Sequence, residues 1–249
     1  VPGPSEPPES ALAPEQTPAE ADMQDETEGV REPLPPLNES TGAVTDVLTG
    51  MFGADALSAL FNSDEFVRRF VVTVDNLSSP KLPRQNLLFK RVAGPFAVTG
   101  EGDQRVIALE NAARYAPYVE LATRVETQRL VNIYERFYPL FQEAYAELGA
   151  PDAYFNDRVV EVIDHLLDTP VVAEPIPVVQ PKVFYLYADP GLEALSAGQK
   201  ILLRMGSANA ERIKSKLRDL RAALTRGARG QDGDERPMVD PEATSLRPE

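Results

Sequence analysis

The chain has 249 residues, of which 43% are hydrophobic, so it is long enough to bury one sizeable core. Its formal net charge of −14 argues against sequence-independent nucleic-acid binding, because such proteins present a basic face to the phosphates. It contains no cysteine and one histidine, which excludes disulfides, thiolate metal sites and a metal site built from several histidines of one chain.

The two ends of the chain carry most of the negative charge. Residues 1–42 contain 10 acidic residues, one basic residue and nine of the 23 prolines. Such a segment cannot bury enough apolar surface to offset the entropy of ordering it, so we expect a disordered, acidic, Pro-rich linker. Residues 229–249, with six acidic and three basic residues, are predicted to be a second disordered tail. Residues 43–228 contain 23 acidic and 21 basic residues and should form the folded domain.

Helical periodicity begins close to the end of the predicted linker. Three helices are expected there, over about 41–52, 54–61 and 63–77. Ser63 is the expected N-cap of the third helix. A loop containing Pro80, Pro83 and Gly94 should follow. Short apolar runs on either side of a Gly-rich turn then predict a β-hairpin, with strands within 96–99 and 104–109.

The rest of the domain is predicted to be helical, in segments separated by proline or glycine. Its helices are expected over about 110–125, 127–148, 155–168, 190–205 and 208–225. Pro117 should break the first of them. Four prolines should keep 170–181 extended, and 183–187 is ambiguous between strand and helix. The apolar periodicity predicts a core that includes Phe70, Phe137, Phe141, Val162 and Leu166.

The expected fold is therefore mainly α. It is a single compact helical domain with a small β-hairpin, flanked by disordered acidic tails.

Several blocks of sequence together resemble one known family. They include Leu34-Pro-Pro-Leu-Asn-Glu-Ser40, Arg68–Asn76, Tyr138–Tyr145, Tyr154–Arg158, Val162–Leu167, Gln180–Lys182 and Asp189–Gly206. Over about residues 33–226 the chain resembles the family catalogued as domain of unknown function number 3014. The family has no assigned activity. The resemblance implies a bacterial source and an N-terminal membrane anchor, absent from this chain, followed by a Pro-rich linker. We therefore expect localisation at the cell envelope, in the periplasm and anchored to the inner membrane.

The helix expected over 155–168 has the most informative pattern of charge. Its apolar residues share one face, and four carboxylates fall within about 60° on the other: Asp157, Glu161, Asp164 and Asp168. Arg158 and His165 flank them. Because four carboxylates repel one another, a cation, a basic partner or solvent should compensate. We favour a solvated or salt-bridged face; the alternative is a hard-metal or acid/base site that includes His165.

Two cations on a later helix are complementary to these acids. Lys200 and Arg204 lie one helical turn apart, so they share a face, and we expect one of them to reach Asp157, Glu161 or Asp164. The candidate functional face therefore comprises Asp157, Arg158, Glu161, Asp164, His165, Lys200 and Arg204. No catalytic residue, metal or cofactor is assigned.

Other patterns are interpreted as structural. The aromatic stripe Tyr134, Tyr138, Phe141 and Tyr145 could line a peptide or glycan groove, but such stripes are more typical of a core. The last helix carries Arg212, Lys214, Lys216, Arg218 and Arg221. We interpret it as a packed helix with snorkelling basic residues rather than as a surface for anionic lipid or an acidic partner.

Two classes of function remain. The first is a non-enzymatic interaction or scaffolding module of the bacterial cell envelope, tethered through its N-terminal linker. It would bind an unknown protein partner and no nucleic acid, and would meet the membrane only through its anchor. The alternative is a hydrolase or metal-dependent enzyme that uses the acidic face 157–165. A deep pocket joining that face to Lys200 or Arg204 would favour the enzyme.

Overall fold

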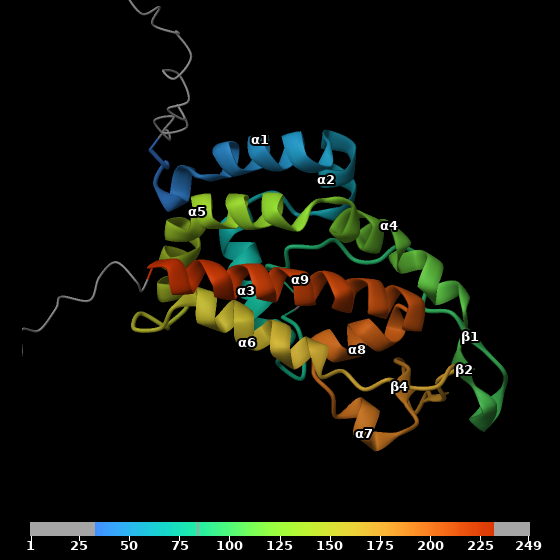
Figure 1. Ribbon diagram of the computed structural model, residues 1–249. Coiled ribbons are helices and arrows are strands. Elements are labelled where there is room, and N and C mark those ends of the chain that lie inside the picture. Colours follow the sequence, from blue (N-terminus) through green and yellow to red (C-terminus); the bar gives the residue numbers. More distant parts are fainter. Residues whose placement is uncertain (1–32, 84, 232–249) are drawn as a thin grey trace, which may run out of the picture. The chain divides into compact units, whose positions relative to one another are not determined.

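The computed structural model describes residues 33–83 and 85–231 (Figure 1). The predicted disorder of residues 1–32 and 232–249 lies outside these residues. The described part is mainly helical, as predicted. Its α-helices are α1 (Thr41–Phe52), α2 (Ala54–Leu60), α3 (Phe66–Leu77), α4 (Glu110–Arg124), α5 (Thr127–Glu147), α6 (Phe155–Leu167), α7 (Pro190–Glu193), α8 (Ala197–Arg204) and α9 (Ser207–Gln231). Two 3-10 turns, η1 (Leu37–Glu39) and η2 (Gly102–Gln104), accompany them.

Three helix boundaries differ from the prediction. α3 begins at Phe66 because Arg69, not Ser63, closes the preceding turn: its Nε donates to Asp64 O at 2.8 Å. Pro117 does not break α4, which continues through it. The helix expected over 190–205 is two helices. Ser196 separates them, because its hydroxyl and the side chain of Gln199 form a capping box that starts α8.

The structure contains one strand pair more than was predicted. The expected hairpin pairs β1 (Val98–Thr99) with β2 (Val106–Ile107), and a second antiparallel hairpin pairs β3 (Val178–Val179) with β4 (Leu186–Tyr187). Main-chain hydrogen bonds join the two hairpins, from Ile107 N to Ile176 O and from Val178 N to Arg105 O, each 2.9 Å long. The ambiguous segment 183–187 thus ends in a strand.

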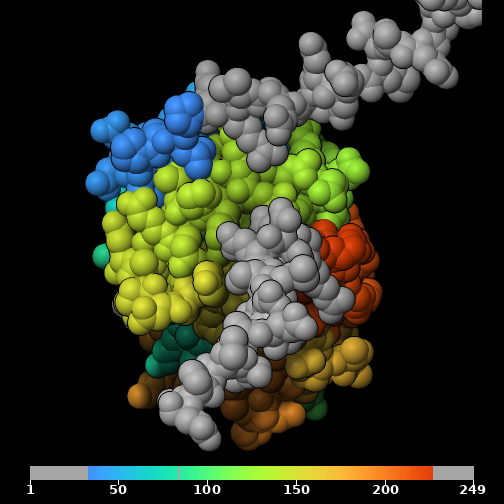
Figure 2. Space-filling model, turned by 60° about the vertical axis from the view of Figure 1, so that its left-hand side comes forward, coloured from blue at the N-terminus to red at the C-terminus, as the bar shows by residue number. Residues whose placement is uncertain are grey.

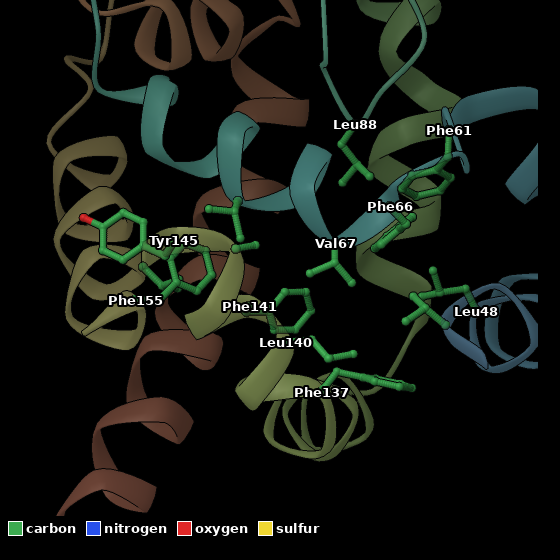
Figure 3. Packing of buried hydrophobic residues seen from close by; sticks show 14 of the residues in the cluster. Leu48, Phe61, Phe66, Val67, Leu88, Phe137, Leu140, Phe141, Tyr145 and Phe155 are labelled. Carbon is green, nitrogen blue, oxygen red and sulfur yellow. The ribbon is translucent and has the colours of Figure 1, made fainter. Parts of the chain in front are cut away.

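The main core lies between α1, α3, α5 and α6. Aromatic rings fill it, and Phe137, Phe141 and Phe155 are among its most buried residues (Figure 3). α9 runs across α4, α5, α6 and α8 and closes this core on one side (Figure 1). The predicted burial of Phe137, Phe141, Val162 and Leu166 is confirmed. Phe70 is half-buried, with its ring 4.9 Å from that of Phe141.

The folded unit begins earlier than the predicted boundary at residue 43. Leu37 and Ser40 are buried, and the Ser40 hydroxyl donates to Leu37 O at 2.7 Å. The first described residues pack directly on α5 (Figure 2). The apolar side chains of Leu34 and Leu37 explain the difference, because they join the core although they lie within a Pro-rich segment. At the other end, α9 continues to Gln231, beyond the predicted end at 228.

Among the described residues, no single helix has both the length and the apolar composition needed to cross a membrane. Helices α1 and α2 meet both criteria only when they are taken together, and they are bent by 111° at their junction.

Candidate functional site

Arg158 ties α6 to the end of α3. Its guanidinium donates to Asp75 Oδ1 at 2.8 Å, to Asp75 O at 2.7 Å and to Ser78 Oγ at 2.8 Å. It also pairs with Glu161, one turn along α6, at 2.9 Å. Only 18% of the Arg158 side chain is exposed. Burial acts to lower the pKa of Arg158, but the hydrogen bonds to Glu161 and Asp75 raise it above its usual value. Arg158 is therefore a charged structural link.

Asp164 pairs with an arginine that the sequence analysis did not select for it. Arg221, on α9, meets the Asp164 carboxylate with both Nε and Nη2, the latter at 2.9 Å from Oδ2. This hydrogen-bonded pair lowers the pKa of Asp164 below its ordinary value. The predicted pairing of the acidic face with Lys200 or Arg204 is therefore wrong for Asp164 and for Glu161, which pairs with Arg158.

Lys200 and Arg204 instead contact residues of α7 and of the two hairpin regions. The Lys200 ammonium donates to Glu193 O at 2.9 Å and lies 3.3 Å from Glu193 Oε1. The Arg204 guanidinium stacks over two rings, with its Cζ atom 5.5 Å from the ring centre of Tyr187 and 6.0 Å from that of Phe96. β4 lies beside α7, so α7 supplies the partner of Lys200 and the hairpin supplies a ring for Arg204.

His165 and Asp157 remain from the predicted face. The backbone oxygen of His165 accepts a hydrogen bond of 3.1 Å from Gln199, and its Nε2 atom is buried with no hydrogen-bond partner among the described residues. Asp157 is exposed. Within the described part of the chain, no three acidic or histidine side chains lie close enough together to hold a metal ion. The residues of the candidate face therefore do not form one site: Arg158, Asp164 and Lys200 each bind a different part of the chain.

The five basic residues of α9 between positions 212 and 221 each bind a group of the same chain. Lys214 is buried and donates to Thr169 O, just beyond the end of α6. Lys216 donates to Val125 O and Thr127 Oγ1, where α4 meets α5. The three arginines donate to side chains: Arg212 to Thr123, Arg218 to Glu211, and Arg221 to Asp164. The interpretation of a packed helix is confirmed.

The aromatic stripe of α5 belongs largely to the core. Phe141 and Tyr145 are buried, and the Tyr134 ring stacks on Phe141 with centres 5.5 Å apart. Burial raises the pKa of Tyr134 well above its ordinary value. The core interpretation is therefore supported.

The most unusual surface is one that the sequence analysis did not select. Nine large hydrophobic side chains are exposed among the described residues, and four of them lie in the second hairpin: Val179, Val183, Phe184 and Leu186. Val183 and Phe184, at the tip of the hairpin, are 78% and 75% exposed. Concentrated exposed apolar side chains mark interaction surfaces more often than scattered ones do. In the sequence, the one feature that indicates this surface is the run of apolar residues within 175–188, which contains no acidic residue.

The fold and these contacts define a class: a mainly helical domain whose charged residues join its elements, with several exposed apolar side chains on a β-hairpin. The chain belongs to the family described as "Protein of unknown function (DUF3014)", whose model matches residues 66–221. The resemblance noted in the sequence is thus confirmed, over a shorter stretch than residues 33–226. Comparisons with curated proteins and with solved structures give no significant match.

Proposed function

We propose that this chain is a non-enzymatic interaction or scaffolding module of the bacterial cell envelope, and that its second hairpin is the surface that binds a protein partner. The observation that carries the proposal is the concentration of exposed apolar side chains within residues 179–186. Tyr187 and Val178, at the base of the hairpin, are buried, so the tip is presented on an ordered support. A preformed apolar tip loses little conformational entropy on binding.

The charged residues support the same proposal. Each of three charged residues forms an ion pair with a residue from another element of the chain: Arg158, Asp164 and Lys200. Charged groups that are satisfied in this way stabilise the fold and are poorly suited to bind a substrate or a metal ion. No observation on the described residues specifically favours the hydrolase or metal-dependent alternative.

Tethering at the envelope is the part of the proposal that rests on sequence. Residues 1–33 contain nine acidic residues, one basic residue and seven prolines, a composition typical of an extended, self-repelling spacer. A bacterial source and an inner-membrane anchor are what family membership suggests. A spacer of this kind would let the module reach partners at a distance from its anchor.

The proposal is tested by site-specific photo-crosslinking in the organism that encodes the protein. A photoreactive amino acid replaces Phe184 in the full-length gene product, and in a matched control it replaces Tyr154, which is also exposed but lies before α6. We expect a discrete crosslinked product from position 184 only, recovered in the envelope fraction. No product from position 184, or the same products from both positions, would overturn the interaction surface. Recovery of the protein in the cytoplasmic fraction would overturn its location.

A further inference from the structure

The loop between α3 and β1 carries positive charge that the proposed function does not use. Its described residues, 78–83 and 85–97, include three basic residues and no acidic one. The basic residues are Lys81, Lys90 and Arg91, and all three are exposed. None of them makes an ion pair with a described residue. The charge of this loop is therefore open to an anionic partner.

The helices around the loop do not cancel its charge. Hydrogen bonds join the loop to α2, α3, α4 and α8. α2 contains one acidic residue and no basic one, α4 contains two of each, and α8 contains two basic residues and no acidic one. The three acidic residues of α3 and of the turn before it each pair with an arginine. An anion that approaches the loop therefore meets an excess of positive charge.

One part of this loop combines charge with an exposed aromatic ring. Phe89, which is 43% exposed, directly precedes Lys90 and Arg91. The centre of its ring lies 5.0 Å from the ring centre of Phe61 and 6.1 Å from that of Tyr118. Phe89 and Phe61 are also joined by an isolated β-bridge. The exposed ring is thus presented on an ordered support.

A further cation is fixed beside these residues. Arg114, on α4, donates from Nε to Ala93 O at 2.9 Å and from Nη2 to Gly94 O at 2.8 Å. The Lys90 ammonium donates to the backbone oxygen of Ser58, in the last turn of α2. These acceptors are neutral, so both side chains keep their positive charge while they hold the loop on α2 and α4.

We propose that Phe89, Lys90, Arg91 and Arg114 form a surface that binds a membrane containing anionic lipids. The basic side chains bind headgroup phosphates, and the adjacent ring enters the boundary between headgroups and acyl chains. A lipid surface is favoured over an acidic peptide because it offers phosphates and an apolar layer together and requires no cleft. This inference goes beyond the proposed function, which concerns the hairpin, and differs from the expectation that the chain meets the membrane only through an anchor.

The net charge of the whole chain does not prevent this contact. A charge of −14 opposes the approach to an anionic surface. At physiological ionic strength, however, salt screens the field of distant charges over about 8 Å, so the residues in contact with the lipid decide the outcome.

The test is binding of the full 249-residue chain to lipid vesicles, measured by co-sedimentation. Wild type should bind vesicles that contain about one third phosphatidylglycerol and not vesicles of phosphatidylcholine alone. Lys90→Gln combined with Arg91→Gln should weaken binding about 30-fold, since each basic contact contributes about fivefold. Arg136→Gln combined with Arg226→Gln removes the same charge at exposed positions on α5 and α9. This matched control should bind like wild type, and circular dichroism checks that both variants fold.

A tryptophan at position 89 tests whether the ring enters the lipid. The chain contains no tryptophan, so one introduced there reports on that position alone. The emission of Phe89→Trp should shift to shorter wavelength when the anionic vesicles are added, because the indole leaves water. Tyr154→Trp, at another exposed position, is the control and should show no shift.

Three results would overturn the inference: wild type that does not bind the anionic vesicles, an equal loss of binding in the two double variants, or no emission shift at position 89. Binding to soluble polyglutamate but not to vesicles would also overturn it, and would assign the surface to an acidic peptide. Crosslinking at Phe184 is a separate measurement, so failure of the lipid contact leaves the proposed function standing.

Discussion

At the scale of single residues, Gly198 shows how closely the helices pack. It lies in the first turn of α8, which faces α3 and α6. A Cβ atom there would lie 2.5 Å from Leu166 Cδ2 and 2.8 Å from the backbone oxygen of Leu77. The leucine side chain can move, but the backbone oxygen at the end of α3 cannot do so without shifting that helix. Only glycine permits this approach.

We expect Gly198→Ala to lower the free energy of unfolding by about 1–3 kcal/mol through overpacking, as measured by urea denaturation. Gly50→Ala is the matched control, because nothing lies within 4 Å of a Cβ atom at this exposed position in α1. It should stabilise the chain by about 0.5–1 kcal/mol, since alanine favours a helix over glycine. Equal effects at the two positions would contradict the packing of α8 on α3.

The ion pair of Asp164 with Arg221 predicts a specific pH dependence. The pKa of Asp164 is lowered in the folded chain from its ordinary value of 3.8. Its contribution to stability is therefore present above about pH 4 and is lost as the pH falls through the folded-state pKa. Asp164→Asn should have a small destabilising effect at pH 7, because both side chains are partly exposed, and that difference should shrink as the pH falls below about 4.

The measurement is urea unfolding of both proteins across this range. Asp168→Asn, in the exposed residue that follows α6, is the control and should show no comparable change with pH. If Asp164→Asn has the same stability as wild type at pH 7, the ion pair contributes nothing and the predicted pH dependence is wrong.

At the scale of elements, α9 organises the helices around it. Lys214 and Arg221 are two turns apart on one face: Arg221 binds α6, and Lys214 binds Thr169 O just beyond its end. Lys216 binds the junction of α4 and α5. A lysine that donates to a carbonyl at a helix end satisfies an oxygen that the helix itself leaves without a partner. The basic pattern of α9 is therefore a device for joining helix ends.

Lys214→Met should lower the free energy of unfolding by about 1–3 kcal/mol, because it leaves the buried Thr169 oxygen without its donor. Arg218→Met is the control: Arg218 and its partner Glu211 are both more than half exposed, so its loss should change stability little. Thermal or urea unfolding of the three proteins measures the effect. A larger loss for Arg218→Met than for Lys214→Met would contradict this role of α9.

At the scale of the whole molecule, the folded unit starts at Leu34. Deleting residues 1–33 should change the free energy of unfolding by less than about 0.5 kcal/mol, because their composition is unsuited to a core. Leu37→Ala in the full chain should lower it by about 2–5 kcal/mol, because Leu37 is buried. Urea unfolding distinguishes the two. A large loss on deletion would mean that the acidic segment packs on the domain.

The sequence by itself determined the mainly α fold, most helix positions and most of the predicted core. These follow from the spacing of apolar residues, which is a local property: Phe137 and Phe141 lie one turn apart, so they share the helix face that the other helices cover. The sequence-based prediction was wrong at two places. A capping box at Ser196 divides the helix expected over 190–205, and Leu37 is buried although it lies in a Pro-rich segment.

Only the tertiary structure decided the partners of the charged residues and the exposure of the second hairpin. Asp164 and Arg221 are 57 positions apart, and opposite charge alone could not favour Arg221 over Lys200 or Arg204. Val183 and Phe184 are apolar and would be expected inside, yet the hairpin turns them outwards. Apolar periodicity depends on neighbours within one or two turns, whereas an ion pair or an exposed tip depends on how distant elements pack, which no local pattern encodes.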